Sequence, residues 1–128
     1  MKTNNSINYN KSYNSILDFE LINGTFEATI ESYTTIPAAT DPITDRIIRD
    51  SYISVDFRLN TNEIINTRWY SKRLPYIMRQ ISYQLDRTFY KLTDMLEILK
   101  ITPITIELSI DPKYGPQVEY DLRKINEY

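Results

Sequence analysis

The chain has 128 residues, a formal net charge of −2 and 41% hydrophobic residues, which is the size and composition of one globular domain. It contains no His and no Cys, so neither a Ser-His-Asp or Cys-His catalytic group nor a typical zinc site can be built from it. The chemistry that remains is that of carboxylates with Mg²⁺ or Ca²⁺, or of Tyr, Lys and Arg acting alone. A carboxylate-metal enzyme is therefore the third hypothesis, and we expect no enzymatic activity and no cofactor. The 11 Tyr, with frequent Ile and Thr, favour β-sheet because these side chains suit pleated, half-buried surfaces.

The sequence lacks the features of a targeting or membrane segment. Residues 1–10 have no apolar stretch of the kind found in signal peptides, and no run approaches the roughly 18 apolar residues that a membrane-spanning helix needs. We expect a cytoplasmic protein that makes no contact with membranes. Residues 1–15 are rich in Asn, Ser and Tyr without a hydrophobic period, which predicts a flexible tail followed by one domain over residues 16–128.

The first strand is predicted over residues 21–33. Its apolar residues alternate with polar ones, as in Phe26, Ala28 and Ile30. A period of two is typical of a half-buried strand. Residues 34–51 carry Pro37 and Pro42 and predict a long loop, with a short helical turn around residues 44–48.

A β-hairpin is predicted from two further strands, residues 52–59 and 64–70, which alternate apolar and polar side chains and are joined by a short polar connection. Neighbouring residues of a strand face opposite sides, so Trp69 and Tyr70 cannot both point outward. Tyr70 shares its face with Arg68, and this face is the more polar one. We expect Trp69 in the core and Tyr70 at the surface.

After the hairpin the hydrophobic period changes to that of helices. Apolar residues at spacings of three and four predict a helix over residues 74–85, with Ser71 as its N-cap. A second short helix is predicted to begin after Thr93. Residues 104–110 and 118–122 alternate again and predict a closing hairpin around a turn rich in Pro and Gly.

The order of these elements indicates a β-rich α+β fold. Three strands, one or two helices and a two-stranded hairpin follow one another along the chain. This is the order expected of a five-stranded OB-type barrel, which places its helix between strands 3 and 4. Other α+β folds share five strands and a helical insertion, so the order of elements leaves them as alternatives.

A family resemblance accompanies this order. Residues 23–30, Asn-Gly-Thr-Phe-Glu-Ala-Thr-Ile, resemble the opening strand of the small OB-fold single-stranded-DNA-binding proteins of phages and mobile elements. In that family a long loop follows, then a strand similar to residues 52–59 and a strand that ends in an aromatic pair similar to Trp69-Tyr70. Residues 93–99 and the strand after them resemble the closing section of these proteins.

The resemblance extends over about residues 21–122 and consists of periodicity and a few anchoring residues. It implies an OB fold and binding of single-stranded DNA in phage or mobile-element DNA replication or recombination. The implied partners are single-stranded DNA, replication or recombination proteins and further copies of the chain. The resemblance supplies no catalytic residue. The chain differs from the family in having no glycine in the connection 60–63.

Charge is unevenly distributed along the chain. Residues 68–91 carry six cations and one acid, whereas residues 1–50 carry four cations and seven acids. A local basic segment suits contact with phosphates, because Lys and Arg release counterions where they touch a nucleic-acid backbone. A solvated helix face would account for the same cations equally well.

Binding of single strands also needs aromatic faces on which bases can stack. An OB fold binds through its second and third strands and through the loops after strands one and four. We therefore expect the binding surface on the polar face of the 52–70 hairpin and beside it. The candidate residues are Tyr33, Tyr52, Arg58, Arg68, Tyr70, Lys72, Arg73, Lys113 and Tyr114.

Carboxylates give no metal-binding pattern. Asp41, Asp45 and Asp50 lack the Asp-x-Asp-x-Asp-Gly spacing of a calcium loop, and Glu27 and Glu31 are separated on their strand by a threonine. We expect no metal site.

The alternative function is a small protein-interaction module or inhibitor that binds a larger enzyme without touching nucleic acid. Tyr is enriched at protein interfaces, so the many Tyr of an acidic β-rich domain suit this role as well.

Overall fold

The computed structural model describes residues 23–125. The predicted flexible tail, residues 1–15, lies outside this range. The elements in chain order are β1 (Gly24–Ile36), β2 (Ala39–Thr40), β3 (Ile47–Arg49), β4 (Tyr52–Leu59), β5 (Ile64–Tyr70), η1 (Ser71–Arg73), α3 (Leu74–Leu85), α4 (Leu92–Ile98), β6 (Ile104–Asp111), β7 (Gly115–Glu119) and α5 (Leu122–Ile125).

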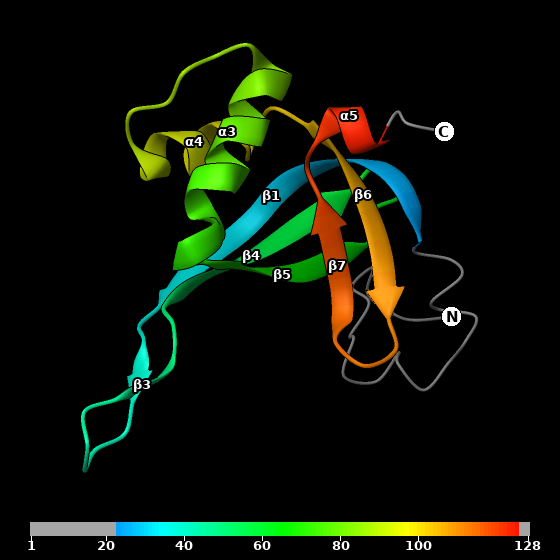
Figure 1. Cartoon of the computed structure of the whole chain (residues 1–128). Helices are drawn as coiled ribbons and strands as arrows, with labels where there is room; N and C mark the ends of the chain where they lie inside the picture. The colour runs from blue at the N-terminus through cyan, green and yellow to red at the C-terminus, as the bar shows by residue number, and fades with distance from the viewer. Residues whose placement is uncertain (1–22, 126–128) are drawn as a thin grey trace.

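Five of these strands form one antiparallel sheet in the order β5-β4-β1-β6-β7, with α3 and α4 between β5 and β6 along the chain (Figure 1). The predicted β-rich α+β class with five strands is confirmed. In the described part of the chain no main-chain ladder joins the edge strands β5 and β7, so the sheet is open.

The β4–β5 hairpin was predicted from its alternation, and the structure confirms it. Its register runs from the pair Tyr52 and Tyr70 to the pair Arg58 and Ile64. Burial alternates along β4 because every second side chain enters the core. No glycine forms the turn. Asn62 instead adopts the left-handed conformation, with φ 75°, which Asn enters more readily than most residues.

Strand β1 is the centre of the sheet and lies further along the chain than predicted, because it begins at Gly24 and continues past Tyr33 to Ile36. Its first part, residues 24–28, pairs with β6, and residues 28–36 pair with β4. The register with β4 shifts between Ile30 and Ser32, which marks a β-bulge and lets one strand serve both partners.

The predicted helical turn around residues 44–48 is wrong. Ile47–Arg49 forms β3 and pairs with β2, so residues 37–51 make a narrow two-stranded arm that projects from the sheet (Figure 1). Two local effects explain the difference. The Asp41 carboxylate accepts a hydrogen bond from the backbone N–H of Ile43 at 2.8 Å, which fixes a turn. The neighbouring β-branched isoleucines then favour extended backbone.

The helices differ from prediction at their ends. Helix α3 covers the predicted residues 74–85, but Ser71 does not cap it, because η1 intervenes and the hydroxyl of Ser71 bonds to Ser51. Helix α4 begins at Leu92, so Thr93 lies inside it. None of the helices within residues 23–125 is long and apolar enough to cross a membrane.

The predicted continuation of the last strand to Leu122 is wrong, because β7 ends at Glu119 and α5 begins at Leu122. The Asp121 carboxylate accepts the backbone N–H of Arg123 at 3.0 Å, as an N-capping side chain does. Tyr120 fits the apolar alternation of β7 by position. It lies after the end of that strand, and its ring is buried in the core where the chain turns into α5.

The core lies between the sheet and the helices and is centred on aromatic side chains. Trp69 is buried, as predicted. Its ring lies 6.2 Å from that of Phe57 and 6.0 Å from that of Tyr120, the second contact being edge-to-face at 88°. Such pairs stabilise a core beyond their buried area.

Candidate nucleic-acid interface

The outer face of the β4–β5 hairpin carries alternate residues of both strands, opposite the side that faces the core. Four predicted site residues lie on it: Tyr52, Arg58, Arg68 and Tyr70. The register pairs Tyr52 with Tyr70 at one end of the face and Arg58 with Ile64 at the other. The two ends therefore have different chemistry.

At the first end two rings and two guanidinium groups form one group, which we name the Tyr52 cluster: Tyr52, Tyr70, Arg68 and Arg49. The two tyrosine rings lie 5.2 Å apart with 47° between their planes. The Arg68 guanidinium carbon lies 4.8 Å from the centre of the Tyr52 ring, and that of Arg49 lies 5.2 Å from it. These distances allow cation–π attraction.

Arg68 also donates a hydrogen bond from Nη1 to the Tyr70 hydroxyl at 3.3 Å. This bond raises the pKa of Arg68 above its ordinary value, so the group is a permanent cation. The same bond and the ring contact hold Arg68 between both tyrosines. In this arrangement a base can contact a half-exposed ring while its phosphate contacts the cation beside that ring.

Sequence reasoning did not identify Arg49. Its Nη2 donates to the carbonyl of Pro37 at 2.7 Å across the base of the arm, while its buried Nε has no hydrogen-bond partner within the described range. Arg49 lies at the base of the arm, because β3 ends there and β4 begins three residues later at Tyr52. No signal in the sequence gave this contact, since residues 34–51 were predicted as a loop.

The second end of the face is polar and internally bonded. The side-chain amide of Asn66 donates to Ser54 Oγ at 2.8 Å and to Asp56 Oδ1 at 2.7 Å. Arg58 Nε lies 2.9 Å from Glu31 Oε1, and this hydrogen bond lowers the pKa of Glu31. Because Glu31 is ionised and bound to Arg58, this end of the face carries little net positive charge.

Two more predicted cations follow the Tyr52 cluster directly along the chain in η1. The Lys72 side chain is 83% exposed, and its ammonium lies 3.3 Å from the Asp50 carboxylate. The Arg73 guanidinium carbon lies 5.2 Å from the centre of the Tyr76 ring. Both side chains are at the surface in the segment that directly follows Tyr70; the ion pair with Asp50 offsets the charge of Lys72, so Arg73 contributes more of the positive charge there.

The remaining three predicted residues lie elsewhere. Tyr33 pairs with the buried Val55 and so faces away from the Tyr52 cluster; its hydroxyl donates to Glu97 at 2.6 Å. This bond raises the pKa of Tyr33 and lowers that of Glu97. Lys113 and Tyr114 form the β6–β7 turn, which Figure 1 places at a different corner of the molecule from the end of β5.

Carboxylates of the described residues form no metal-binding group. No set of three Asp or Glu side chains within residues 23–125 is arranged so that it could hold a metal ion. The arrangement offers ring faces and guanidinium groups for non-covalent contact.

Comparison with known proteins gives no identification. No protein-family model, curated protein or solved structure matches this chain. The function must therefore be inferred from the chemistry of its own surface.

Proposed function

We propose that this chain binds single-stranded nucleic acid, most simply DNA, without catalysis, in the replication or recombination of a phage or mobile element. The observation that carries the proposal is the Tyr52 cluster: the Tyr70 ring and the guanidinium groups of Arg49 and Arg68 each lie against the Tyr52 ring on the outer face of the β4–β5 hairpin. Base stacking on aromatic side chains contributes about 1–3 kcal/mol per base and tolerates any sequence.

The proposal includes an OB-type barrel. Strands β4 and β5 would be the second and third barrel strands, which bind oligonucleotides in that fold. The arm between β1 and β4 would be the loop after strand one. Support comes from the two edge strands, because the indole of Trp69 in β5 bonds to Tyr120, which directly follows β7, at 2.7 Å.

Local charge supports the proposal although the whole chain has a net charge of −2. Arg49 and Arg68 are fixed in the Tyr52 cluster, and Lys72 and Arg73 adjoin it. Each phosphate contact made by such a group on a single strand contributes a slope of about −0.7 to log K against log salt. Two to four contacts would therefore give moderate salt dependence.

The test is a fluorescence-anisotropy titration of labelled oligo-dT at low and moderate salt, with a duplex of the same length as control. Tyr70→Ala and Arg68→Ala should each weaken binding about tenfold, the effect of losing one stacked base or its cation. Tyr90→Ala and Arg79→Ala are matched controls, because neither residue makes a ring contact, hydrogen bond or ion pair among the described residues.

Undetectable oligo-dT binding at low salt would overturn the proposal. Equal losses in the control variants would also do so, because binding would then reflect charge in general and not the Tyr52 cluster.

A second candidate function is the protein-interaction module that binds a larger enzyme. Three isoleucines on the projecting arm favour it, since Ile43, Ile47 and Ile48 are 90%, 64% and 69% exposed. Large apolar side chains exposed on a projecting segment suit contact with a partner protein. This function predicts that a variant with all three changed to Ser keeps its fold and oligonucleotide affinity but no longer retains its protein partner.

A further inference from the structure

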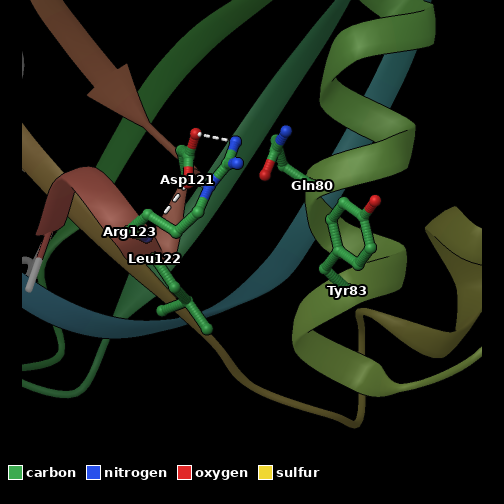
Figure 2. A pocket seen from close by; sticks show the side chains of 5 residues that line it. All are labelled: Gln80, Tyr83, Asp121, Leu122 and Arg123. Atoms are coloured by element: carbon green, nitrogen blue, oxygen red, sulfur yellow. Dashed lines mark hydrogen bonds and ion pairs between the residues drawn. The ribbon is translucent and has the colours of Figure 1, made fainter.

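A cavity of about 260 Å³ lies between α3 and the start of α5, at the other end of α3 from Tyr70. Figure 2 shows the five residues that line it: Gln80 and Tyr83 from α3, and Asp121, Leu122 and Arg123 from the chain around α5. None of them belongs to the Tyr52 cluster. The cavity is therefore a separate feature of the molecule.

The decisive residue of this cavity is Gln80. It is only 5% exposed, and its carboxamide makes no hydrogen bond with any residue of the described range. Figure 2 shows this carboxamide directed into the space between α3 and α5. Its amide oxygen and nitrogen are not among the sealed side-chain atoms that lack a partner, so they are reached through the cavity, and their hydrogen-bonding groups are available to a molecule that enters it.

Gln84, one turn further along α3, shows what a structural glutamine does in this fold. Its Nε2 donates to the carbonyls of Thr105 and Tyr120, at 2.7 and 3.0 Å, and its Oε1 accepts the N–H of Thr105 at 2.7 Å. Both N–H groups and the oxygen of the Gln84 carboxamide are thus bonded to the backbone of the fold. Gln80 has the same side chain on the same helix and no such partner.

The charges around the cavity cancel each other. Arg123 donates from Nε to Asp121 Oδ1 at 3.0 Å and from Nη2 to Oδ2 at 2.8 Å, in a two-point ion pair. The Asp121 carboxylate is buried and fully engaged by this pair. A charged ligand would therefore find no unpaired opposite charge in the cavity. An uncharged polar ligand needs none.

The remaining lining residues, Tyr83 and Leu122, add an aromatic ring and an aliphatic side chain to the cavity. Tyr83 is 70% exposed at the rim, and Leu122 contributes an aliphatic side chain. A carboxamide presents a donor and an acceptor side by side, and its complement is a planar edge with an acceptor beside a donor. The edges of nucleobases have this pattern, and glutamine binds adenine through it. Tyrosine rings stack on the same bases.

We propose that this cavity binds one uncharged nucleobase-type heterocycle, with its donor–acceptor edge on Gln80 and its ring against Tyr83. The inference does not depend on strand binding at the Tyr52 cluster. The base has two sources, a free nucleoside or a base of a strand, and both present the same edge.

The test uses the full ¹⁵N-labelled chain, with adenosine, thymidine and uridine as probes and with ribose and inorganic phosphate as controls. A nucleoside should shift the side-chain amide signals of Gln80 and the backbone signals of Leu122 in a saturable manner, and the controls should not. Gln80→Leu keeps the volume and removes the amide, and it should weaken binding at least tenfold. Tyr83→Ala changes an exposed residue and should weaken binding several-fold.

Absence of saturable shifts at millimolar nucleoside would overturn the proposal and leave water as the occupant. Unchanged affinity in Gln80→Leu, or in Tyr83→Ala should the first variant not fold, would do the same. Tyr90→Ala changes an exposed ring outside both the cavity and the Tyr52 cluster and should leave the shifts at Gln80 unchanged; an equal loss would show that binding is not specific to the cavity. A titration with oligo-dT identifies the source of the base. If the oligonucleotide shifts the Gln80 signals, the cavity binds a base of a strand. If only nucleosides shift them, it binds a free nucleoside.

Discussion

The indole nitrogen of Trp69 donates a 2.7 Å hydrogen bond to the hydroxyl of Tyr120, and both residues are buried. Trp69 belongs to the edge strand β5, and Tyr120 follows β7 at the opposite edge of the sheet. The two edges are thus linked through side chains inside the core although no main-chain ladder joins them. Burial raises the pKa of the Tyr120 hydroxyl, so it remains protonated in this contact.

Tyr120→Phe should lower the free energy of unfolding by about 1–3 kcal/mol, because it leaves the buried indole N–H without an acceptor. Urea denaturation checks this, and the fluorescence of Trp69, the sole Trp of the chain, reports it directly. Tyr114→Phe is the control. It removes the hydroxyl of an exposed ring and should change stability by less than about 0.5 kcal/mol. Equal midpoints for both variants would contradict this role of the hydrogen bond.

Asn62 gives a prediction about the hairpin turn. With φ at 75°, it occupies a conformation that a β-branched residue enters only with strain. Asn62→Val should destabilise the protein by about 1–2 kcal/mol, whereas Asn62→Gly should leave stability unchanged or raise it slightly. Thermal unfolding of the two variants measures the difference. If Val and Gly at this position gave the same midpoint, the turn would not require a left-handed residue.

The pair Tyr33 and Glu97 gives a prediction about pH. The hydrogen bond from Tyr33 lowers the pKa of Glu97, so its contribution to stability is complete above the ordinary Glu value and is lost as pH falls through the lowered one. The same bond raises the pKa of Tyr33, so its contribution is complete below the ordinary Tyr value and is lost as pH rises through the raised one. The pair should therefore stabilise the protein across the neutral range.

Glu97→Gln should reduce the fall in urea midpoint between pH 6 and about pH 3, because the variant has no carboxylate to protonate. Tyr33→Phe is the companion variant, because it removes the hydroxyl that bonds to Glu97 and keeps the carboxylate, so it separates this bond from the ion pair of Glu97 with Lys100 at 3.0 Å. An acid dependence that is the same in Glu97→Gln and the unaltered protein would show that the contact with Tyr33 does not couple to folding.

Replacement by Leu should have different effects on stability at the two glutamines of α3. Gln84→Leu leaves the backbone groups of Thr105 without their partner and should cost about 1–3 kcal/mol in the free energy of unfolding. Gln80→Leu replaces an amide that has no partner in the described range by an apolar group and should leave stability unchanged or raise it. Denaturation midpoints of the two variants decide this, and similar losses in both would show that Gln80 has a structural role.

The elements that could be predicted from the sequence are those long enough to show a repeating pattern of apolar and polar residues. Val55 and Phe57 belong to an eight-residue strand whose alternation is unambiguous. Ile47 and Ile48 belong to a three-residue strand, which is too short to show any period. Tyr120 fits the alternation of β7 by position, although the chain has already turned towards α5.

The candidate site could be predicted only where it lies within one hairpin. Tyr52 and Tyr70 are paired by the register of two adjacent strands, so counting along the chain places them on one face. Arg49 joins them through folding of the arm, which local patterns do not encode. Gln80 did carry a signal: it stands between Ile77 and Ile81 in the apolar stripe of α3, where a polar side chain is unusual.

The double pairing of β1 has a consequence for the order in which the chain folds. Its second part pairs with β4, which is near in sequence, and these strands can form a meander with β5 as soon as they are synthesised. Its first part pairs with β6, where Glu27 and Thr105 are 78 positions apart. Closing so long a loop is slow. A nascent chain would therefore expose the first part of β1 as an unpaired edge until β6 has left the ribosome, and during this interval aggregation competes with folding.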